Sequence, residues 1–482
     1  MLRSIVNRLA SVSTTLVKLG LIAAVVVIGL GIGYKTPSLR TPEILVIAAL
    51  LPLVGMILYR LGRLEYGILG IVLTAGLVRF TLPTGTESEV VASMVVTAVV
   101  VVLWVLNMLV VEKRLWLKPV RTNTPLLIFM AVSIVSYIWS NAFRDVLVIV
   151  WGSFPFVQLA ALVVMVLLPA AFLMVSNKLE EVVWLKRLAW VIIGLGTAAI
   201  VLYQTGIPIK RIFNTRGIFP AWVVALTYAF FLYNEELRPW QRFGLLGVCG
   251  AWLWWQLGQG FLWMSGWAPA LVAVMVISWQ RSKKLFFLLV IAGLVFAGAN
   301  FDSLYYKVVV ESQEEGDFQR LELWRTNLEL VGNHPIFGTG PAGYAVYYMS
   351  YHPENARSTH NNYFDIIAQT GVVGFTAYLW FWAALAYTGY ELCQKLNHQR
   401  NFESAYATAM LGGCAAAIAS GMLGDWIIPF AYNQTIEGFD HSIYAWVLLG
   451  GMVTLWHIVK ARTAQNDTTG EQHRHDQAKT YS

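Results

Sequence analysis

Long blocks of apolar residues constrain this chain more than any other feature of its sequence. A helix of about 18 or more apolar residues is long enough to cross a hydrocarbon core about 30 Å thick. Apolar blocks lie at 16–34, 44–59, 66–83, 89–111, 124–140, 155–176, 188–206, 217–234, 243–258, 263–279, 285–300, 365–392, 404–430 and 442–459. Only 13% of the residues are charged, whereas a soluble domain has about 25%. We therefore predict an all-α polytopic membrane protein with about 12–14 transmembrane helices.

The basic residues predict how the chain is threaded through the membrane. If the N-terminus is inside and the spans alternate, the inside segments hold roughly twice as many Lys and Arg as the outside segments. Cytoplasmic loops carry this excess, so both termini are predicted to be cytoplasmic. We predict one transmembrane domain, residues 1–462, followed by a polar, disordered cytoplasmic tail, residues 463–482. The net charge of +7 lies mainly in short loops, which indicates membrane lipids as partners and no nucleic acid.

One outside loop, residues 301–364, is much longer than the others. Long loops in compact proteins are usually functional or disordered, and this one is not of low complexity. Its apolar residues recur at helical spacing, which predicts a helix over 317–331 at the outer membrane face. Gly332, Asn333 and Pro335 follow as a helix stop signal. Residues 338–343 match G-x-G-x-x-G without a preceding strand, so we interpret them as a tight turn, with a phosphate cradle as the alternative.

Three cationic or titratable residues map to the predicted outer interface. Arg216 lies where a short outside loop re-enters the membrane, and Arg320 lies near the start of the loop helix. His360 directly precedes the span that begins near residue 365. Arginine binds phosphate oxygens through a planar fork and stays charged, and histidine can remove a proton near neutral pH. These residues suit chemistry on a diphosphate, while lipid-headgroup contact is the alternative for each arginine and a structural role is the alternative for the histidine.

Further residues are weaker candidates for the same site. Arg79 and Asp425 lie near the outer ends of their spans, where ionisable groups are either functional or interfacial. There is no D-x-D motif, so we predict neither a metal nor another cofactor. The predicted substrate-binding residues are Asn361, Tyr363, Arg325, Arg211, Lys210, Arg357 and Asp425.

Several motifs in this region resemble the bacterial O-antigen ligase and O-antigen polymerase superfamily of membrane glycosyltransferases. They are Arg320–Trp324, His334–Gly340, Thr359–Tyr363 and Gln369–Gly374, preceded by an arginine motif at Arg216–Phe219. The upstream motif often continues with Pro-Asn, whereas Pro220 is followed here by Ala221. The resemblance implies a bacterial inner-membrane protein that carries its active site on the periplasmic face.

The resemblance also implies a reaction. A glycan carried on undecaprenyl diphosphate would be transferred, without a metal, to an acceptor hydroxyl. Arg216 and Arg320 would bind the diphosphate, and His360 would orient or deprotonate the acceptor. The acceptor would be lipid A core for a ligase, a glycan for a polymerase, or a protein for an oligosaccharide transferase. A lipid-linked glycan transporter is the alternative from another class, but it would place charged groups near the bilayer midplane, whereas the candidates here cluster at the outer face.

The predicted threading has a direct test. Cysteine in place of Ser312, within the long loop, should react with a membrane-impermeant maleimide added to intact cells. Cysteine in place of Lys113, in a predicted cytoplasmic loop, should react only after permeabilisation. The opposite pattern would overturn the topology and the location of the site.

Overall fold

The computed structural model describes residues 64–79, 81–83, 89–205, 213–259, 264–301, 317–352, 358–433 and 435–480. These residues are mainly helical. The helices in chain order are α3 (Glu65–Leu77), α4 (Ala92–Leu106), η1 (Asn107–Val111), α5 (Asn123–Ala142), α6 (Phe154–Lys178), α7 (Val182–Gln204), α8 (Phe219–Tyr233), α9 (Pro239–Gln259), α10 (Met264–Arg281), α11 (Lys283–Ala299), α14 (Asp317–Asn333), α15 (Gly343–Tyr351), α16 (Asn362–Lys395), α17 (Phe402–Leu423), η4 (Ile436–Gly438) and α18 (Phe439–Thr480). Two short strands, β1 (Thr81–Pro83) and β2 (Glu89–Val91), form an antiparallel hairpin.

The predicted fold class, an all-α polytopic membrane protein, is confirmed. Within the described residues, 7 helices are long and apolar enough to cross a membrane, and α3 and α8 are shorter apolar helices. Each predicted span from 66–83 onward overlaps one of the helices. The predicted ends of two spans are too late, because α3 ends at Leu77 and α17 ends at Leu423. The first two predicted spans, 16–34 and 44–59, lie outside the described residues, so the total of about 12–14 stays a prediction.

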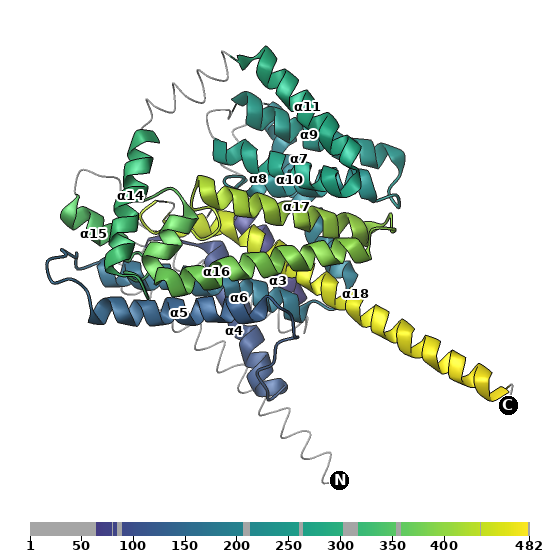
Figure 1. Cartoon of the computed structure of the whole chain (residues 1–482), viewed down its shortest axis with the longest axis horizontal. Coiled ribbons are helices and arrows are strands. Elements are labelled where there is room, and N and C mark those ends of the chain that lie inside the picture. The colour runs from purple at the N-terminus through teal and green to yellow at the C-terminus, as the bar shows by residue number, and fades with distance from the viewer. Residues whose placement is uncertain are drawn as a thin grey trace, which may run out of the picture.

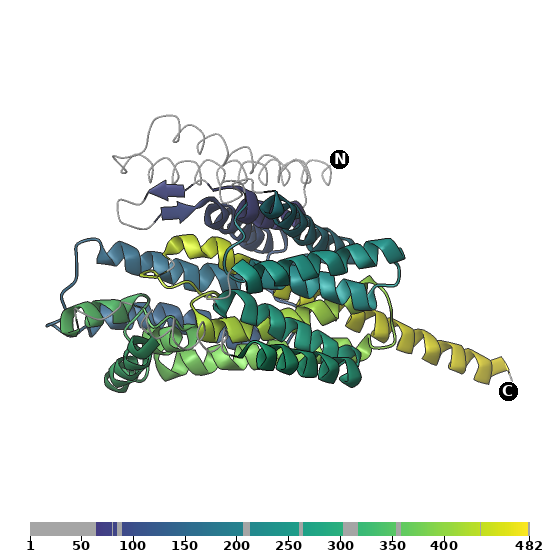
Figure 2. The same cartoon turned by 90° about the horizontal axis from the view of Figure 1, so that it is seen from above.

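Most of the long helices run along one common axis, and small residues let the central ones approach closely (Figure 1). Helix α17 packs against α8, α10 and α16, and α18 packs against α6. A Cβ on Gly413 of α17 would overlap the Trp222 ring of α8. Such small residues are typical of helix interfaces in membranes, where van der Waals packing drives association. Figure 2 shows β1 and β2 at the same end of the bundle as α15.

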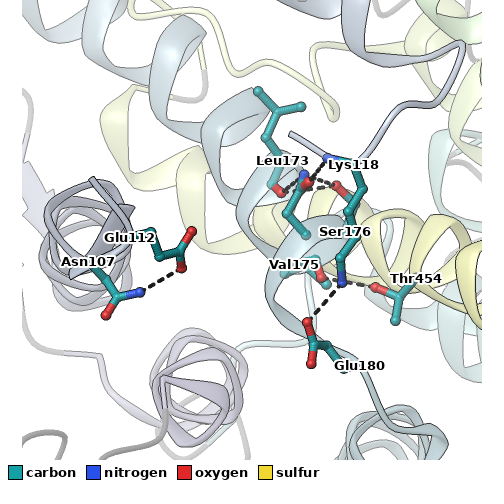
Figure 3. Close-up of polar contacts among 9 residues, drawn as sticks. Asn107, Glu112, Lys118, Leu173, Val175, Ser176, Glu180 and Thr454 are labelled. Atoms are coloured by element: carbon teal, nitrogen blue, oxygen red, sulfur yellow. Dashed lines mark hydrogen bonds and ion pairs between the residues drawn. The ribbon is translucent and has the colours of Figure 1, made fainter. Parts of the chain in front are cut away.

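The bundle has two chemically different ends. We call the end that carries α14 and α15 the loop end, and the opposite end the basic end (Figure 1, left and right). At the basic end, Lys118 pairs with Glu180 at 3.2 Å and Arg462 pairs with Glu403 at 2.8 Å. Figure 3 shows the Lys118 pair beside Thr454, whose hydroxyl donates to the Val175 carbonyl at 2.9 Å. Loops that we predict to be cytoplasmic meet at this end, although its side of the membrane stays a prediction.

The polar C-terminal segment differs from the expected disordered tail. Helix α18 continues through Thr480, so most of residues 463–482 are helical, and only 481 and 482 lie outside the described residues. Extending an existing helix avoids the unfavourable nucleation step. The segment contains no proline to stop that extension.

The loop helix predicted over 317–331 is confirmed as α14, which ends at Asn333 as the Gly-Asn signal indicated. The chain then turns and docks against a break in α16 at Gly371, where φ is 65° and ψ is −171°. The Thr339 N–H donates to the Ala368 carbonyl at 2.9 Å, and the Val372 N–H donates to the Pro335 carbonyl at 2.8 Å. Backbone hydrogen bonds therefore join the turn to the broken helix.

This joint predicts the effect of one small substitution. A Cβ on Gly371 would overlap the Ile336 carbonyl, and its backbone angles are open almost only to glycine. Gly371→Ala should therefore lower the free energy of unfolding by about 1–3 kcal/mol, measured by thermal melting in detergent. The matched control is Gly247→Ala in α9, where nothing lies within 4 Å of the added Cβ. Equal melting of the two variants would contradict this account of the joint.

Candidate functional site

A cavity of about 840 Å³ lies at the loop end. It is formed by residues that follow α3, by the segment that precedes α8, by α9, and by the start of α18. Its polar lining includes Arg79, Tyr203, Asn214, Arg216, Glu437, Asp440 and His441. One of the three principal predicted residues, Arg216, therefore lines a cavity together with a second arginine.

The backbone before Arg216 is held from three directions. The Arg79 guanidinium donates to the Phe213 carbonyl at 2.6 Å, and the Asn214 N–H donates to the Gly76 carbonyl at 2.9 Å. The Tyr203 and Thr215 hydroxyls are hydrogen-bonded at 2.8 Å. These bonds fix the segment that carries Arg216, whose side chain stays exposed.

Two arginines and two acidic residues line this cavity. Burial lowers the pKa of Arg79, and the neighbouring Arg216 charge lowers it further. Asp440 is buried and accepts hydrogen bonds from the Ser93 hydroxyl and, at 3.2 Å, from the Asn214 amide. Glu437 is exposed. Through these two bonds, Asp440 joins the Asn214 segment, which leads to Arg216, to Ser93 of α4.

His360 and α14 form the second part of the site. The Trp324 indole of α14 donates to the Thr359 carbonyl at 2.9 Å, and its ring stacks on Phe364 with centroids 5.0 Å apart. Arg320 is near the start of α14, four residues, or about 6 Å along the helix, before Trp324. The helix carrying Arg320 is therefore fastened to the residue immediately before His360.

A network of buried hydrogen bonds holds the segment that carries His360. The Thr359 hydroxyl donates to Asp365 at 2.6 Å, and the Tyr344 hydroxyl donates to the same oxygen. His360 itself has φ of 51° and is half-buried. A positive φ is uncommon for a residue other than glycine and is found where the surroundings over-determine the backbone. The segment is thus built rigidly, with its histidine in a strained conformation.

The segment between α17 and α18 joins the two parts. The Asn362 side chain accepts from the Ile427 N–H at 2.9 Å and donates to the Ile428 carbonyl at 2.7 Å. The preceding residue, Trp426, lies against Gly217, where φ is +62° and an added Cβ would come within 2.8 Å of the indole ring. Contacts therefore run without a break from Arg216 to the residues next to His360.

Comparison with protein families bears on the same region. Residues 243–379 match the family model described as O-antigen ligase. This match supports the resemblance to the O-antigen ligase and polymerase superfamily. Members of this family are membrane glycosyltransferases. No curated protein matches the chain.

The match begins in α9 and ends in α16, so the ligase segment includes α14, α15 and His360. The cavity residues Arg79, Arg216, Asp440 and His441 lie outside it. The segment between α17 and α18 contacts both Asn362 and Gly217, and it therefore joins the ligase segment to the flanking parts of the chain.

Inside the ligase segment, the glycine-rich turn uses its own N–H groups for structure. The Gly340 N–H donates to the Gln369 carbonyl at 3.0 Å, and the Ala342 N–H donates to the Gln369 side chain at 2.7 Å. A Cβ on Gly340 would overlap the Ser140 hydroxyl. This hydrogen bonding favours the tight-turn interpretation over the phosphate cradle.

The predicted substrate-binding residues are distributed unevenly. Asn361 caps α16 through its bond from the Tyr363 N–H at 2.9 Å, and the Tyr363 hydroxyl donates to the Ile418 carbonyl at 2.8 Å. Asp425 is buried and accepts from the Phe430 N–H at 2.8 Å. Arg325 is 83% exposed and pairs with Glu329 on the same helix. The residues outside the described part of the structure are Lys210, Arg211, Arg357 and the side chain of Arg320.

Sequence reasoning missed the residues that α18 contributes. Asp440 and His441 line the cavity, but they were absent from the predicted site. The available signal was an adjacent pair of titratable residues at the outer end of the last span, a position that is a functional candidate by default. Within the described ranges, no three His, Cys, Asp or Glu side chains gather as a metal-binding group.

Proposed function

We propose that this glycosyltransferase moves a glycan from undecaprenyl diphosphate to an acceptor hydroxyl at the loop end, as an O-antigen ligase. The observation that carries the proposal is the cavity where Arg79 and Arg216 come together beside the ligase segment. The acceptor oxygen attacks the anomeric carbon and forms the new glycosidic bond. The bond from that carbon to the diphosphate oxygen breaks, and undecaprenyl diphosphate leaves with the bonding electrons.

Donor binding follows from the chemistry of the cavity. Each arginine has five N–H donors, and one Arg79 nitrogen is occupied by the Phe213 carbonyl. Two cations close together repel each other, and a diphosphate relieves that repulsion while accepting several hydrogen bonds. Negative charge grows on the diphosphate as it leaves, so the same arginines stabilise the transition state more than the substrate. Arg320 is the third proposed cation of this set.

The acceptor side is assigned to His360. Its neutral imidazole would take the acceptor proton as the new bond forms. The fixed Thr359–Asn362 backbone would hold that imidazole in place, because a general base must stay within hydrogen-bond reach of the proton. Lipid A core is the proposed acceptor, while a glycan or a protein would make the chain a polymerase or an oligosaccharide transferase.

The function predicts the outcome of a purified assay. Protein in detergent should transfer glycan from undecaprenyl diphosphate to lipid A core, without ATP and with a divalent-metal chelator present. Products are separated on a gel and identified by mass spectrometry. Transfer to another glycan in place of lipid A core would make the protein a polymerase. Movement of donor across vesicles without any new glycosidic bond would favour the transporter.

The proposed roles predict different defects in variants. Arg216→Lys keeps the charge but loses the planar fork, so transfer should fall by about 100- to 1,000-fold with weaker donor binding. His360→Ala should reduce transfer by about 100- to 10,000-fold while still binding the donor. Both are measured with labelled undecaprenyl diphosphate on folded protein.

The matched control for Arg216→Lys is Arg238→Lys, an exposed residue in the segment between α8 and α9 at the basic end. Full transfer by the Arg216 and His360 variants would reduce both residues to structural or headgroup contacts. Loss of donor binding in His360→Ala would overturn the separation of roles.

A further inference from the structure

A second cavity, of about 580 Å³, lies at the basic end and is not used by the proposed reaction. It is formed by the start of α5, the end of α16 and the later turns of α18. Its charged lining consists of Arg121, Glu391, Lys395 and Lys460. Because the cations come from three separate parts of the chain, the fold brings them together around one space.

The charges in this cavity do not cancel. Glu391 uses one oxygen for Arg121, at 3.1 Å, and the other for Lys395, at 3.0 Å. Lys460 lies over the Trp456 ring, 4.7 Å from its centroid, and no carboxylate of the described residues forms an ion pair with it. Three cations against one carboxylate leave two positive charges, so the cavity favours an anion.

Two neutral polar groups at the start of α5 belong to residues that line the same cavity. Asn123 is 8% exposed, and its Oδ1 has no hydrogen-bond partner although its amide donates to the Lys118 carbonyl at 2.8 Å. The N–H of Thr124 likewise has no partner among the described residues, and α5 has no side-chain N-cap. The first N–H groups of a helix favour anions. The cavity therefore offers one acceptor beside several donors.

An apolar strip leads away from this cavity along the bundle surface. The Arg121 guanidinium lies over the Tyr387 ring, 4.2 Å from its centroid. Tyr387 of α16 is 54% exposed, and Trp380, about two helical turns away, is 50% exposed. Leu127 and Ile128 on the neighbouring helix α5 are also exposed. Exposed apolar side chains in a membrane protein suit contact with acyl chains, so a charged headgroup site and a chain-binding surface are continuous.

We propose that this cavity binds an anionic phospholipid whose headgroup carries a free hydroxyl, of the phosphatidylglycerol class. The phosphate is bound by Lys460, Arg121 and the N–H of Thr124. The headgroup hydroxyl donates to Asn123 Oδ1, and the acyl chains lie along α5 and α16. Basic pockets between transmembrane helices on the cytoplasmic side bind anionic headgroups in this way. The proposal is independent of the transfer reaction.

Native mass spectrometry of the full chain, released from detergent with added lipids, tests the proposal. Phosphatidylglycerol should be retained in preference to phosphatidylcholine of the same chain length. Each basic residue near a membrane surface contributes about 1 kcal/mol, so Arg121→Gln with Lys460→Gln should weaken retention by at least about tenfold. Arg238→Gln, which removes an exposed cation elsewhere at the basic end, should leave retention unchanged.

Two further experiments distinguish recognition of the headgroup hydroxyl from recognition of the phosphate, and a bound lipid from a soluble anion. Asn123→Ala should reduce the preference for phosphatidylglycerol over phosphatidic acid, which lacks the headgroup hydroxyl, and it leaves the cations in place. Inorganic phosphate at millimolar concentration should not displace the lipid. Equal retention of phosphatidylglycerol and phosphatidylcholine by the wild type would overturn the proposal. Equal loss of phosphatidylglycerol from Arg238→Gln and from the Arg121→Gln, Lys460→Gln double variant would also overturn it. Displacement by phosphate would assign the cavity to a soluble anion.

Discussion

Backbone hydrogen bonding between the glycine-rich turn and the break in α16 positions much of the loop end. An unpaired backbone N–H or C=O costs several kcal/mol in a membrane, so a broken helix needs partners. The break at Gly371 receives them from the turn through the Thr339 and Gly340 N–H groups. The turn also connects α14 to α15, and α16 begins two residues after His360. One joint therefore sets the relative positions of the helix carrying Arg320 and the segment carrying His360.

The cavity lined by Arg79 and Arg216 depends on side-chain contacts rather than on a backbone joint. The Arg216 charge adds to burial in lowering the pKa of Arg79, yet the Arg79 guanidinium is already tied to the Phe213 carbonyl. Asp440 keeps the intervening backbone in place through its hydrogen bond from the Asn214 amide. The proposed diphosphate would meet an Arg79 guanidinium that the fold has already oriented. Such preorganisation is the main source of electrostatic catalysis, because little rearrangement remains to be done during the reaction.

The spacing of apolar residues and the helix stop signals in the sequence predicted the local structure well. The apolar blocks located the helices, and the spacing of apolar residues with the Gly-Asn stop located α14 to within a few residues. The parts that sequence reasoning missed come from contacts between distant positions. Ser93 and Asp440 are 347 positions apart, and no local pattern indicates that they meet. The same limit applies to the glycine-rich turn, whose two interpretations differ only in the partners of its N–H groups.

Asn362 shows how one side chain can connect the two parts of the site. Its amide satisfies backbone groups of both Ile427 and Ile428, which lie in an irregular segment between α17 and α18. Irregular backbone at the edge of a membrane protein must find such partners within the protein. Because Asn362 also begins α16, the same amide couples the His360 segment to the backbone that carries Trp426. Trp426 in turn packs on Gly217, where a larger residue would displace the ring. The relative position of the Arg216 and His360 segments is therefore set by a short chain of buried contacts rather than by either loop alone.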